Sequence, residues 1–342
     1  MLSKKELEQI KESLEKSQNP LFFFDNDVDG FCSFIIFQKS IGRGKGVAIK
    51  SFPDLDKSYL RKVEELNPDH VFILDKPRVS KEFIDGVFEK GIPITWIDHH
   101  EVELEDEIKE KIDYFNSFPS SEPTTFLAYK TFERKTEQWL AVAGCIGDNY
   151  MPDFAKEYAK ENPEFLSTTK SPFDCMYKTE IGKISAMINF GLKDTTTNVL
   201  HMFRLFIKSN NPTDILDENT ETRHLHQKYE QLMKHMAILL RKTENIGKNL
   251  ILLEYAGETS MSSELANKLQ FDNPNKHILV MYKKQDVGNI SVRGKKAKEY
   301  LLKSIENILG ATGGGHPEAC GARVPTENLE EFKKNFEKLV NA

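Results

Sequence analysis

Short apolar runs alternate with amphipathic stretches along the first hundred residues of the chain. Each run is bounded by polar residues, which is typical of a buried strand, whereas the stretches between the runs carry apolar residues at helical spacing. The strands are expected at 21–24, 47–52, 71–74 and 94–97, and the helices at 4–18, 31–39, 58–66 and 81–89. Strands that alternate with helices predict βαβ units and a mainly parallel sheet.

The pattern becomes mostly helical between residues 121 and 208, most clearly at 124–133, 139–146 and 183–190. A long charged stretch at 218–245 follows and contains few residues that break helices. It predicts a helix that connects two domains, with the arm of a coiled-coil dimer as the alternative.

The last hundred residues again contain short apolar runs that are typical of strands, which indicates a second α/β domain. Strands are expected at 250–253, 278–281 and 290–292, helices at 262–269 and 296–308, and a glycine-rich loop at 310–316. A chain of 342 residues is long enough for about two domains. The predicted organisation is a first domain at 1–210, a linker helix at 211–245 and a smaller domain at 246–342.

Composition and charge exclude several classes of protein. Apolar residues make up 39% of the chain and charged residues 29%, which is typical of a globular protein. The net charge of −6 argues against a protein that mainly coats nucleic acid. The sequence has no apolar run of transmembrane length and no signal-peptide pattern at its charged start, so a cytoplasmic protein is expected. The cysteines are scattered without a CxxC pair, which favours packing roles: Cys32, Cys145, Cys175 and Cys320.

Acidic residues follow three of the predicted parallel strands, at 25–30, at Asp75 and at 98–100. Because ligands of open α/β sheets bind at the carboxyl ends of the strands, these side chains are expected to converge. Clustered carboxylates repel one another, and a divalent cation removes that cost. Carboxylates and imidazoles without thiolates suit Mn²⁺ or Mg²⁺ better than structural zinc. Each motif alone is also consistent with a turn, a strand-end cap or an accidental histidine pair, but their joint occurrence favours a site.

Five segments together resemble the DHH phosphoesterases over nearly the whole chain. Residues 25–30 (Asp-Asn-Asp-Val-Asp-Gly) resemble motif I in the form found in RecJ-like exonucleases, Asp75 resembles motif II, and residues 98–100 (Asp-His-His) are similar to the signature that names the family. Residues 144–148 resemble motif IV, and the segment 313–321 resembles the glycine-rich loop of the DHHA1 domain. The resemblance implies a catalytic DHH domain joined by a helix to a substrate-binding DHHA1 domain, with the active site in the cleft between them.

The resemblance also implies two divalent cations, with Mn²⁺ preferred and Mg²⁺ as the alternative, which would clamp the oxygens of an in-line attack by water. One ion would be held by Asp25, Asp27 and Asp75, and the other by Asp29, Asp75, His99 and Asp148. Many family members place a histidine upstream of Asp25 on the first ion, where this chain has phenylalanines. Asp98 and His100 would act beside the ions as catalytic residues that contact the phosphate, His100 by donating a proton or a hydrogen bond.

Residues of the second domain are implied to hold the substrate. Arg293 resembles the family's substrate arginine, and its fork of donors suits a phosphate. The glycine-rich loop is expected to direct backbone N–H groups at an anion, with a histidine adding a donor. These residues are Gly313, Gly314, Gly315 and His316. The segment 42–46 is interpreted as a basic loop near the cleft. Four further basic residues are candidates for positive charge around it, although each of the four alone is more typical of a solvated surface: Lys76, Arg78, Lys295 and Lys296.

Three functions are compatible with these features. The first is a metal-dependent phosphodiester hydrolase, a RecJ-like exonuclease or oligonucleotidase that releases nucleoside monophosphates from single-stranded DNA or RNA or from short oligonucleotides. The second is a phosphoesterase of cyclic dinucleotides or of 3′-phosphoadenosine 5′-phosphate. The third is a non-catalytic replication scaffold, against which the full set of ligand residues argues. No motif supports a replication-protein partner or a homodimer, and no membrane contact is expected.

Overall fold

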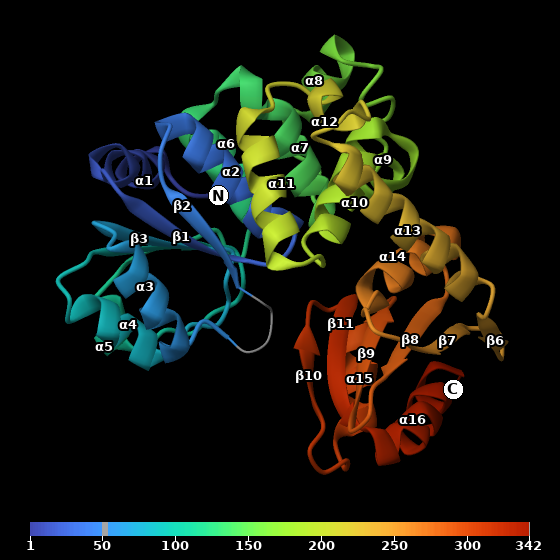
Figure 1. Cartoon of the computed structure of the whole chain (residues 1–342). Helices are drawn as coiled ribbons and strands as arrows, with labels where there is room; N and C mark the ends of the chain where they lie inside the picture. Colours follow the sequence, from blue (N-terminus) through green and yellow to red (C-terminus); the bar gives the residue numbers. More distant parts are fainter. Residues whose placement is uncertain (50–53, 342) are drawn as a thin grey trace. The chain divides into compact units, whose positions relative to one another are not determined.

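The computed structural model describes residues 1–49 and 54–341 and divides into two compact units, Met1–Tyr229 and Glu230–Ala342 (Figure 1). The first unit contains a parallel sheet and the second a mixed sheet, each with helices. This is the predicted α/β class, in which a parallel-sheet domain precedes a smaller α/β domain. The division between the units lies inside a helix, and a separate linker at 211–245 stays a prediction.

Within the described residues, five strands form the sheet of the first unit in the order β2-β1-β3-β4-β5, and all neighbours are parallel. Their bounds are Pro20–Asp25 (β1), Lys45–Ile49 (β2), His70–Leu74 (β3), Ile94–Asp98 (β4) and Asp113–Asn116 (β5). The predicted strands are confirmed, although residues 50–52 of the one expected at 47–52 lie outside the described residues. The sequence pattern does not predict β5, because its residues Asp-Tyr-Phe-Asn form no apolar run.

The helices of the first unit agree with the predicted periodicity. Helix α1 begins after a capping box in which Ser3 and Glu6 accept hydrogen bonds from each other's backbone N–H groups. The bounds are Lys4–Lys16 (α1), Val28–Ile41 (α2), Leu60–Leu66 (α3), Lys81–Phe88 (α4), Asp106–Lys109 (α5), Thr124–Phe132 (α6), Gln138–Gly147 (α7), Ala155–Glu161 (α8), Pro172–Lys178 (α9), Glu180–Gly191 (α10), Thr196–Lys208 (α11) and Thr213–Leu216 (α12), with 3₁₀ turns at Lys57–Tyr59 and Lys135–Glu137. Each helix predicted in this unit has a counterpart whose ends differ by a few residues.

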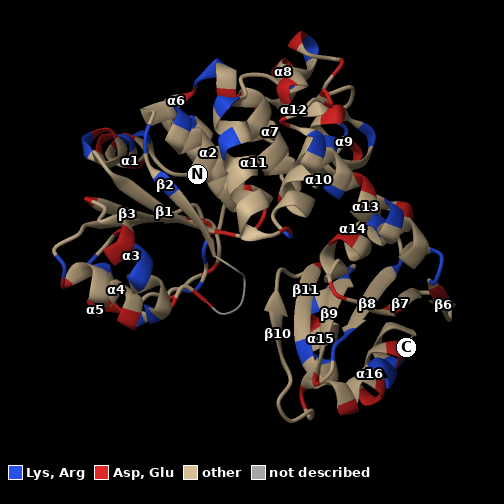
Figure 2. Ribbon diagram, in the orientation of Figure 1, with Lys and Arg blue, Asp and Glu red and all other residues tan. Residues whose placement is uncertain are grey.

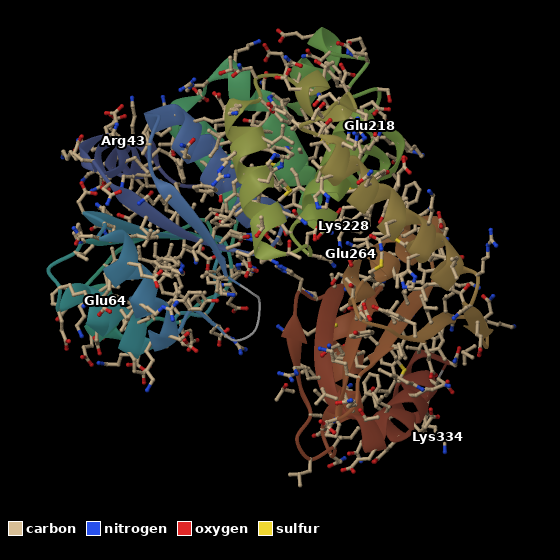
Figure 3. The ribbon with its side chains drawn as sticks, viewed as in Figure 1. Arg43, Glu64, Glu218, Lys228, Glu264 and Lys334 are labelled. Atoms are coloured by element: carbon tan, nitrogen blue, oxygen red, sulfur yellow. The ribbon has the colours of Figure 1, made fainter. Side chains whose placement is uncertain are left out.

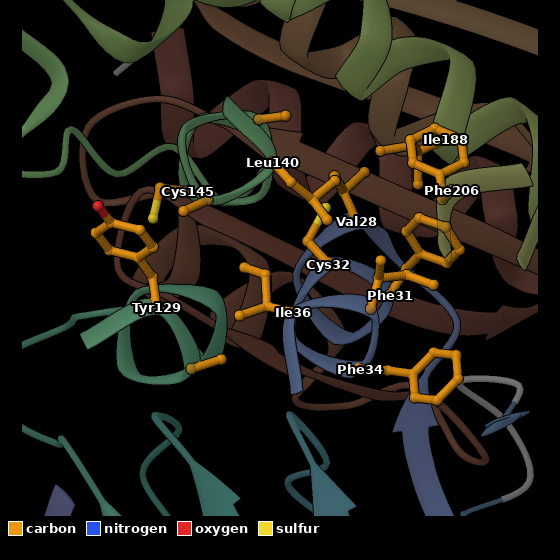
Figure 4. Close-up of a cluster of buried hydrophobic side chains, with 14 of the residues drawn as sticks. Val28, Phe31, Cys32, Phe34, Ile36, Tyr129, Leu140, Cys145, Ile188 and Phe206 are labelled. Carbon is orange, nitrogen blue, oxygen red and sulfur yellow. The ribbon is translucent and has the colours of Figure 1, made fainter. Parts of the chain in front are cut away.

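The central strands are buried on both faces of the sheet. Phe22 and Phe24 of β1 belong to the apolar cluster that includes α2, whereas Leu21 and Phe23 belong to the cluster on the other face, with α4. Side chains alternate between the faces of a strand, so an apolar run without a polar position indicates a sheet covered on both sides. Figure 4 shows part of the first cluster, where α2 packs against α6 and α7.

The long helix predicted at 218–245 is shorter in the structure. Helix α13 (Arg223–Leu240) spans the division between the units. Before it, the side chain of Asn219 accepts hydrogen bonds from the backbone N–H groups two and three residues further along, and this local turn delays the start of the helix. After it, Glu244–Ile246 pairs antiparallel with the next strand as β6, so the end of the charged stretch belongs to a sheet.

Within the described residues, the strand order of the second sheet is β10-β11-β9-β8-β7-β6, and only β7 and β8 are parallel neighbours. The bounds are Glu244–Ile246 (β6), Leu250–Ala256 (β7), Ser262–Asp272 (α14), His277–Lys283 (β8), Val287–Arg293 (β9), Ala297–Ile305 (α15), Thr312–Gly315 (β10), Ala319–Pro325 (β11) and Leu329–Asn341 (α16), with a 3₁₀ turn at Thr326–Asn328. The expected loop at 310–316 is partly a strand. Gly314 opposes Gly321 across β10 and β11, and this backbone pairing needs no side chain.

The basic loop at 42–46 stabilises the end of a helix. Arg43, labelled in Figure 3, donates hydrogen bonds to the carbonyl oxygens of Ser17 at 2.6 Å and Glu15 at 2.7 Å, at the end of α1. Cations near the last carbonyl groups of a helix are favourable. This arginine of the basic loop is therefore engaged by the last carbonyl groups of α1.

Charged side chains of both signs occur along the helices of both units, as α13 and α16 illustrate in Figure 2. The cysteines are all buried and none is in a disulfide, in agreement with packing roles. No described helix combines the length and the apolar composition that crossing a membrane requires.

Candidate metal centre and active site

The strand ends of the parallel sheet bring acidic and imidazole side chains together, as predicted. Strand β1 ends at Asp25, Asp75 directly follows β3, and β4 ends at Asp98, which His99 and His100 follow. Asp75 has a backbone φ of +55°, in the left-handed region that costs a non-glycine residue about 1 kcal/mol or more. Its N–H still donates to a carbonyl of β4 at 2.9 Å, so the neighbouring strand holds this residue in place.

His99 lies at the centre of the cluster. Its Nε2 atom is 3.2 Å from Asp75 Oδ1, 3.6 Å from Asp148 Oδ2 and 3.9 Å from Asp29 Oδ2. The ligand atoms of Asp29, His99 and Asp148 all lie within 4.8 Å of one another. These residues come from α2, from the end of β4 and from the end of α7, so the fold assembles a group that could hold a metal ion.

His100 forms a second contact region beside the first. Its Nδ1 atom lies 2.8 Å from Asp98 Oδ1 and 3.8 Å from Asp75 Oδ1. The ligand atoms of Asp75, His99 and His100 also lie within 4.8 Å of one another. His100 is therefore close enough to be a ligand, although the sequence predicts it to act beside the ions.

Two backbone donors fix the orientation of Asp29. Its carboxylate accepts hydrogen bonds from the N–H groups of Thr124 at 2.8 Å and Thr125 at 2.7 Å, in the first turn of α6. The hydroxyl of Thr125 also donates to the carbonyl oxygen of Asp29 at 2.9 Å. The N-terminus of a helix favours a negative charge. Sequence reasoning missed both threonines, and the only local signal is their place at the start of a predicted helix.

Glycines allow the elements that carry the ligands to approach closely. A Cβ atom on Gly30 would lie 2.5 Å from the carbonyl oxygen of Asp25, which is closer than any real Cβ contact. A Cβ atom on Gly147 would lie 2.9 Å from the side chain of Val28, where the end of α7 passes the start of α2. The glycines of the two motifs therefore serve packing, and this packing brings the carboxylates together.

Burial and neighbouring charges favour the protonated forms of Asp27, Asp75 and Asp148. Burial, with the charge of Asp29, raises the pKa of Asp148 to about 8. Burial, with the charges of Asp25 and Asp29, raises the pKa of Asp27 to about 7, and it raises the pKa of Asp75 well above its ordinary value. A bound cation favours the charged form of a carboxylate and would lower these pKa values again.

The two histidines of the signature differ in charge. Burial lowers the pKa of His99, against the attraction of nearby carboxylates, and so favours the neutral ring that binds metal ions. For His100, burial is outweighed by the hydrogen bond to Asp98 and by other acidic neighbours, which raise its pKa to about 9. This pKa favours the cationic ring at neutral pH, a state that suits contact with a phosphate better than ligation.

Asp25 and Asp27, which are predicted to bind the first ion, have other partners. Lys76 Nζ donates to Asp25 Oδ1 at 2.9 Å. Asp27 is the N-cap of α2, and its Oδ1 accepts a hydrogen bond from Gly30 N at 2.9 Å. Among the described residues, neither belongs to the groups of candidate ligands. Lys76 is buried, so the interpretation of this lysine as a solvated surface charge is wrong.

The donor set fits a divalent cation. Asp75 Oδ1 and Asp98 Oδ2 are buried, and neither has a hydrogen-bond partner among the described residues. Buried polar atoms without partners are costly and call for an explanation such as an ion. Carboxylate and imidazole donors without thiolates suit Mn²⁺ or Mg²⁺.

The predicted substrate residues all lie in the second unit. Arg293 is the last residue of β9, and its guanidinium donates to Asn267 Oδ1 at 2.7 Å and to the carbonyl oxygen of Val292 at 2.9 Å. Residues 313–315 lie in the exposed edge strand β10 (Thr312–Gly315), and His316 follows it. Their role in substrate binding, and a cleft shared with the metal ligands, stay predictions.

Fold and site together define an α/β protein with a carboxylate–histidine cluster at the strand ends of a parallel sheet. Residues 247–342 match the family model of the DHHA1 domain. A search of curated proteins finds no match.

Solved structures share the fold of the whole chain. RecJ from Thermus thermophilus in complex with Mn²⁺ has a TM-score of 0.68 and 16% identity, covering 99% of this chain and 55% of its own, so this chain spans about half of that protein. The exonuclease RecJ bound to manganese has a TM-score of 0.64 and 16% identity, covering 99% of this chain and 95% of its own. A pGpG-specific phosphodiesterase from Vibrio cholerae has a TM-score of 0.50 and 12% identity, covering 95% of this chain and 99% of its own.

The domain match places a DHHA1 domain at residues 247–342, as the glycine-rich motif predicts, and the whole chain shares its fold with the RecJ structures.

Proposed function

We propose that this protein is a divalent-metal-dependent phosphodiester hydrolase. The observation that carries the proposal is the cluster around His99, in which carboxylate oxygens of three residues lie 3.2 to 3.9 Å from one ring nitrogen. Further support comes from two similar structures, the RecJ proteins, which are described with Mn²⁺ or manganese.

The ligands are assigned from this geometry. Asp29, Asp75, His99 and Asp148 are proposed to hold the metal, with Mn²⁺ preferred and Mg²⁺ as the alternative. A divalent cation bound there would stabilise negative charge on a phosphoryl group and lower the pKa of water. Thr124 and Thr125 hold Asp29 in the orientation that this binding needs.

His100 and Asp98 are proposed to act on the phosphate. Asp98 accepts a hydrogen bond from His100 Nδ1 at 2.8 Å, which orients the ring and stabilises its protonated form. A cationic imidazole beside the metal ligands is placed to donate a hydrogen bond or a proton as charge develops on the leaving oxygen.

Single-stranded nucleic acid and short oligonucleotides are the proposed substrates, with nucleoside monophosphates as products. The similarity in fold to RecJ exonucleases supports this class, and Arg293 with residues 313–316 would hold the end of the substrate away from the metal. A small nucleotide is the second candidate, because the fold also matches a pGpG-specific phosphodiesterase along 99% of that chain.

A substrate panel tests the proposal. Metal-stripped protein supplied with Mn²⁺ would be offered 5′-labelled single-stranded DNA and RNA of several lengths, a cyclic dinucleotide and 3′-phosphoadenosine 5′-phosphate. The variant His99→Ala should lose at least about 100-fold in rate, since even the residues that support metal ligands are worth 10- to 100-fold. His201→Ala removes an exposed histidine of α11 and should keep the wild-type rate.

The products decide between the substrate classes. Mononucleotides released from long strands indicate an exonuclease, whereas cleavage of only short strands indicates an oligonucleotidase. Turnover of only the small nucleotides supports the second candidate. If Mn²⁺ binds and no substrate is cleaved, the hydrolase proposal is wrong and the scaffold hypothesis takes its place.

A further inference from the structure

Lys76 places a buried positive charge next to the candidate metal ligands. Its side chain is 3% exposed, and its Nζ atom lies 2.9 Å from Asp25 Oδ1, whose side chain is 15% exposed. Burial of an ammonium group is costly unless a counter-charge compensates it. Because Lys76 directly follows Asp75, the same turn that presents a ligand to the cluster also fixes this ion pair.

The candidate ligands lie around His99. The contacts from His99 to Asp29, Asp75 and Asp148 all involve its Nε2 atom. Both groups of candidate ligands include His99. One ring nitrogen binds one metal ion, so only one of the two groups can be filled through this nitrogen at a time.

Asp25, which the sequence resemblance predicts to hold the other ion, belongs to neither group among the described residues. Lys76 Nζ contacts Asp25 Oδ1, so an ion that used this carboxylate would either displace Lys76 or bind Asp25 Oδ2 next to the ammonium group. Both arrangements place a divalent cation beside a buried ammonium group, and the two positive charges repel each other. The ion pair therefore competes directly with a second metal ion.

We propose that the Lys76 ammonium is a built-in cation that neutralises Asp25 in place of a second divalent ion, so that the centre holds one Mn²⁺ around His99. This inference rests on the proposed function, because it assumes that the His99 group binds metal. It also changes the role of Asp25 from a metal ligand to the partner that keeps Lys76 in position.

Counting bound metal ions tests this proposal without measuring activity. The full chain would be stripped of metal and dialysed against Mn²⁺, and the bound metal would be measured by elemental analysis. Wild type and Lys76→Arg should each bind one ion per chain. Lys76→Met keeps the length of the side chain, removes its charge and frees Asp25, so it should bind two ions that show Mn–Mn coupling in electron paramagnetic resonance.

A double variant keeps the test valid if Lys76→Met folds poorly. Lys76→Met combined with Asp25→Asn leaves no unpaired charge and should return the count to one ion, with the far-ultraviolet circular dichroism of wild type. Two ions in the wild-type protein, or one ion in a folded Lys76→Met protein, would overturn the role of Lys76 and leave the proposed function intact. Absence of any Mn²⁺ binding by wild type would overturn both.

Discussion

At the scale of single residues, burial and hydrogen bonds decide which histidines carry a charge. His99 is buried among carboxylates and favours its neutral form, whereas the hydrogen bond to Asp98 favours the cationic form of His100. His70 is a third case, at the opposite end of the sheet strands. It is buried against Phe72, with its Nε2 atom 2.9 Å from the hydroxyl of Thr95. Burial lowers its pKa to about 4.

His70 should make the protein sensitive to acid. Its pKa is lower in the folded than in the unfolded state, so it contributes stability that is present above pH 6.5 and is lost as the pH falls towards 4. The full loss is at most about 3.5 kcal/mol, from 1.36 kcal/mol per pKa unit. His70→Gln keeps a hydrogen-bonding group for Thr95 and does not titrate. Urea unfolding from pH 7 to pH 4 should show a flatter decline for this variant, and parallel curves for variant and wild type would show that His70 does not contribute.

At the scale of secondary-structure elements, close packing of backbone positions the carboxylates. Helix α2 starts directly after β1, and Gly30 in its first turn lies against the backbone of Asp25. Helix α7 ends where Gly147 lies against Val28, and Asp148 follows. The geometry of the site therefore depends on residues that carry no chemistry of their own.

Gly30→Ala should destabilise the protein although alanine is the better helix former. The added Cβ would lie 2.5 Å from a backbone oxygen, and relief of such an overlap costs about 1–3 kcal/mol, which exceeds the gain in helix propensity of about 1 kcal/mol. The same shift should weaken Mn²⁺ binding. Gly257→Ala is the matched control, because its Cβ would meet no atom within 4 Å. Equal melting temperatures for the two variants would refute this packing argument.

The helices and strands can be predicted from the sequence because buried parallel strands consist of apolar runs. The acidic residues of the site can be predicted because Asp25, Asp75 and Asp98 stand at the ends of those runs. Other contacts leave no such mark. The hydrogen bonds from α6 to Asp29 join residues 95 or 96 positions apart, and the Lys76–Asp25 pair joins residues 51 positions apart. Nothing in the local pattern pairs such residues. Strand β10 is not predicted for another reason. Its consecutive glycines have no side chains, so the alternation of apolar and polar residues that indicates a strand is absent.

At the scale of the whole molecule, the candidate metal ligands and the predicted substrate residues lie in different units. The first carries the candidate metal ligands and the second, which matches the DHHA1 domain, carries the predicted substrate residues. The ligands are drawn from separate stretches of the first unit, at residues 29, 75, 99 and 148. A centre assembled in this way exists only in the folded chain, so binding of a metal ion should also stabilise the fold.

The most direct test of the central claim compares two aspartates five positions apart. Asp148 is a proposed ligand, whereas Asp153 is 59% exposed and pairs only with Lys130 at 3.2 Å among the contacts described. Hydrolysis of a 5′-labelled short single strand by metal-stripped protein would be followed as Mn²⁺ is added. Wild type and Asp153→Asn should regain full activity at the same Mn²⁺ concentration, while Asp148→Asn should need far more Mn²⁺ and reach a lower rate. Equal Mn²⁺ curves for all three proteins, or hydrolysis without added metal, would contradict the proposed centre.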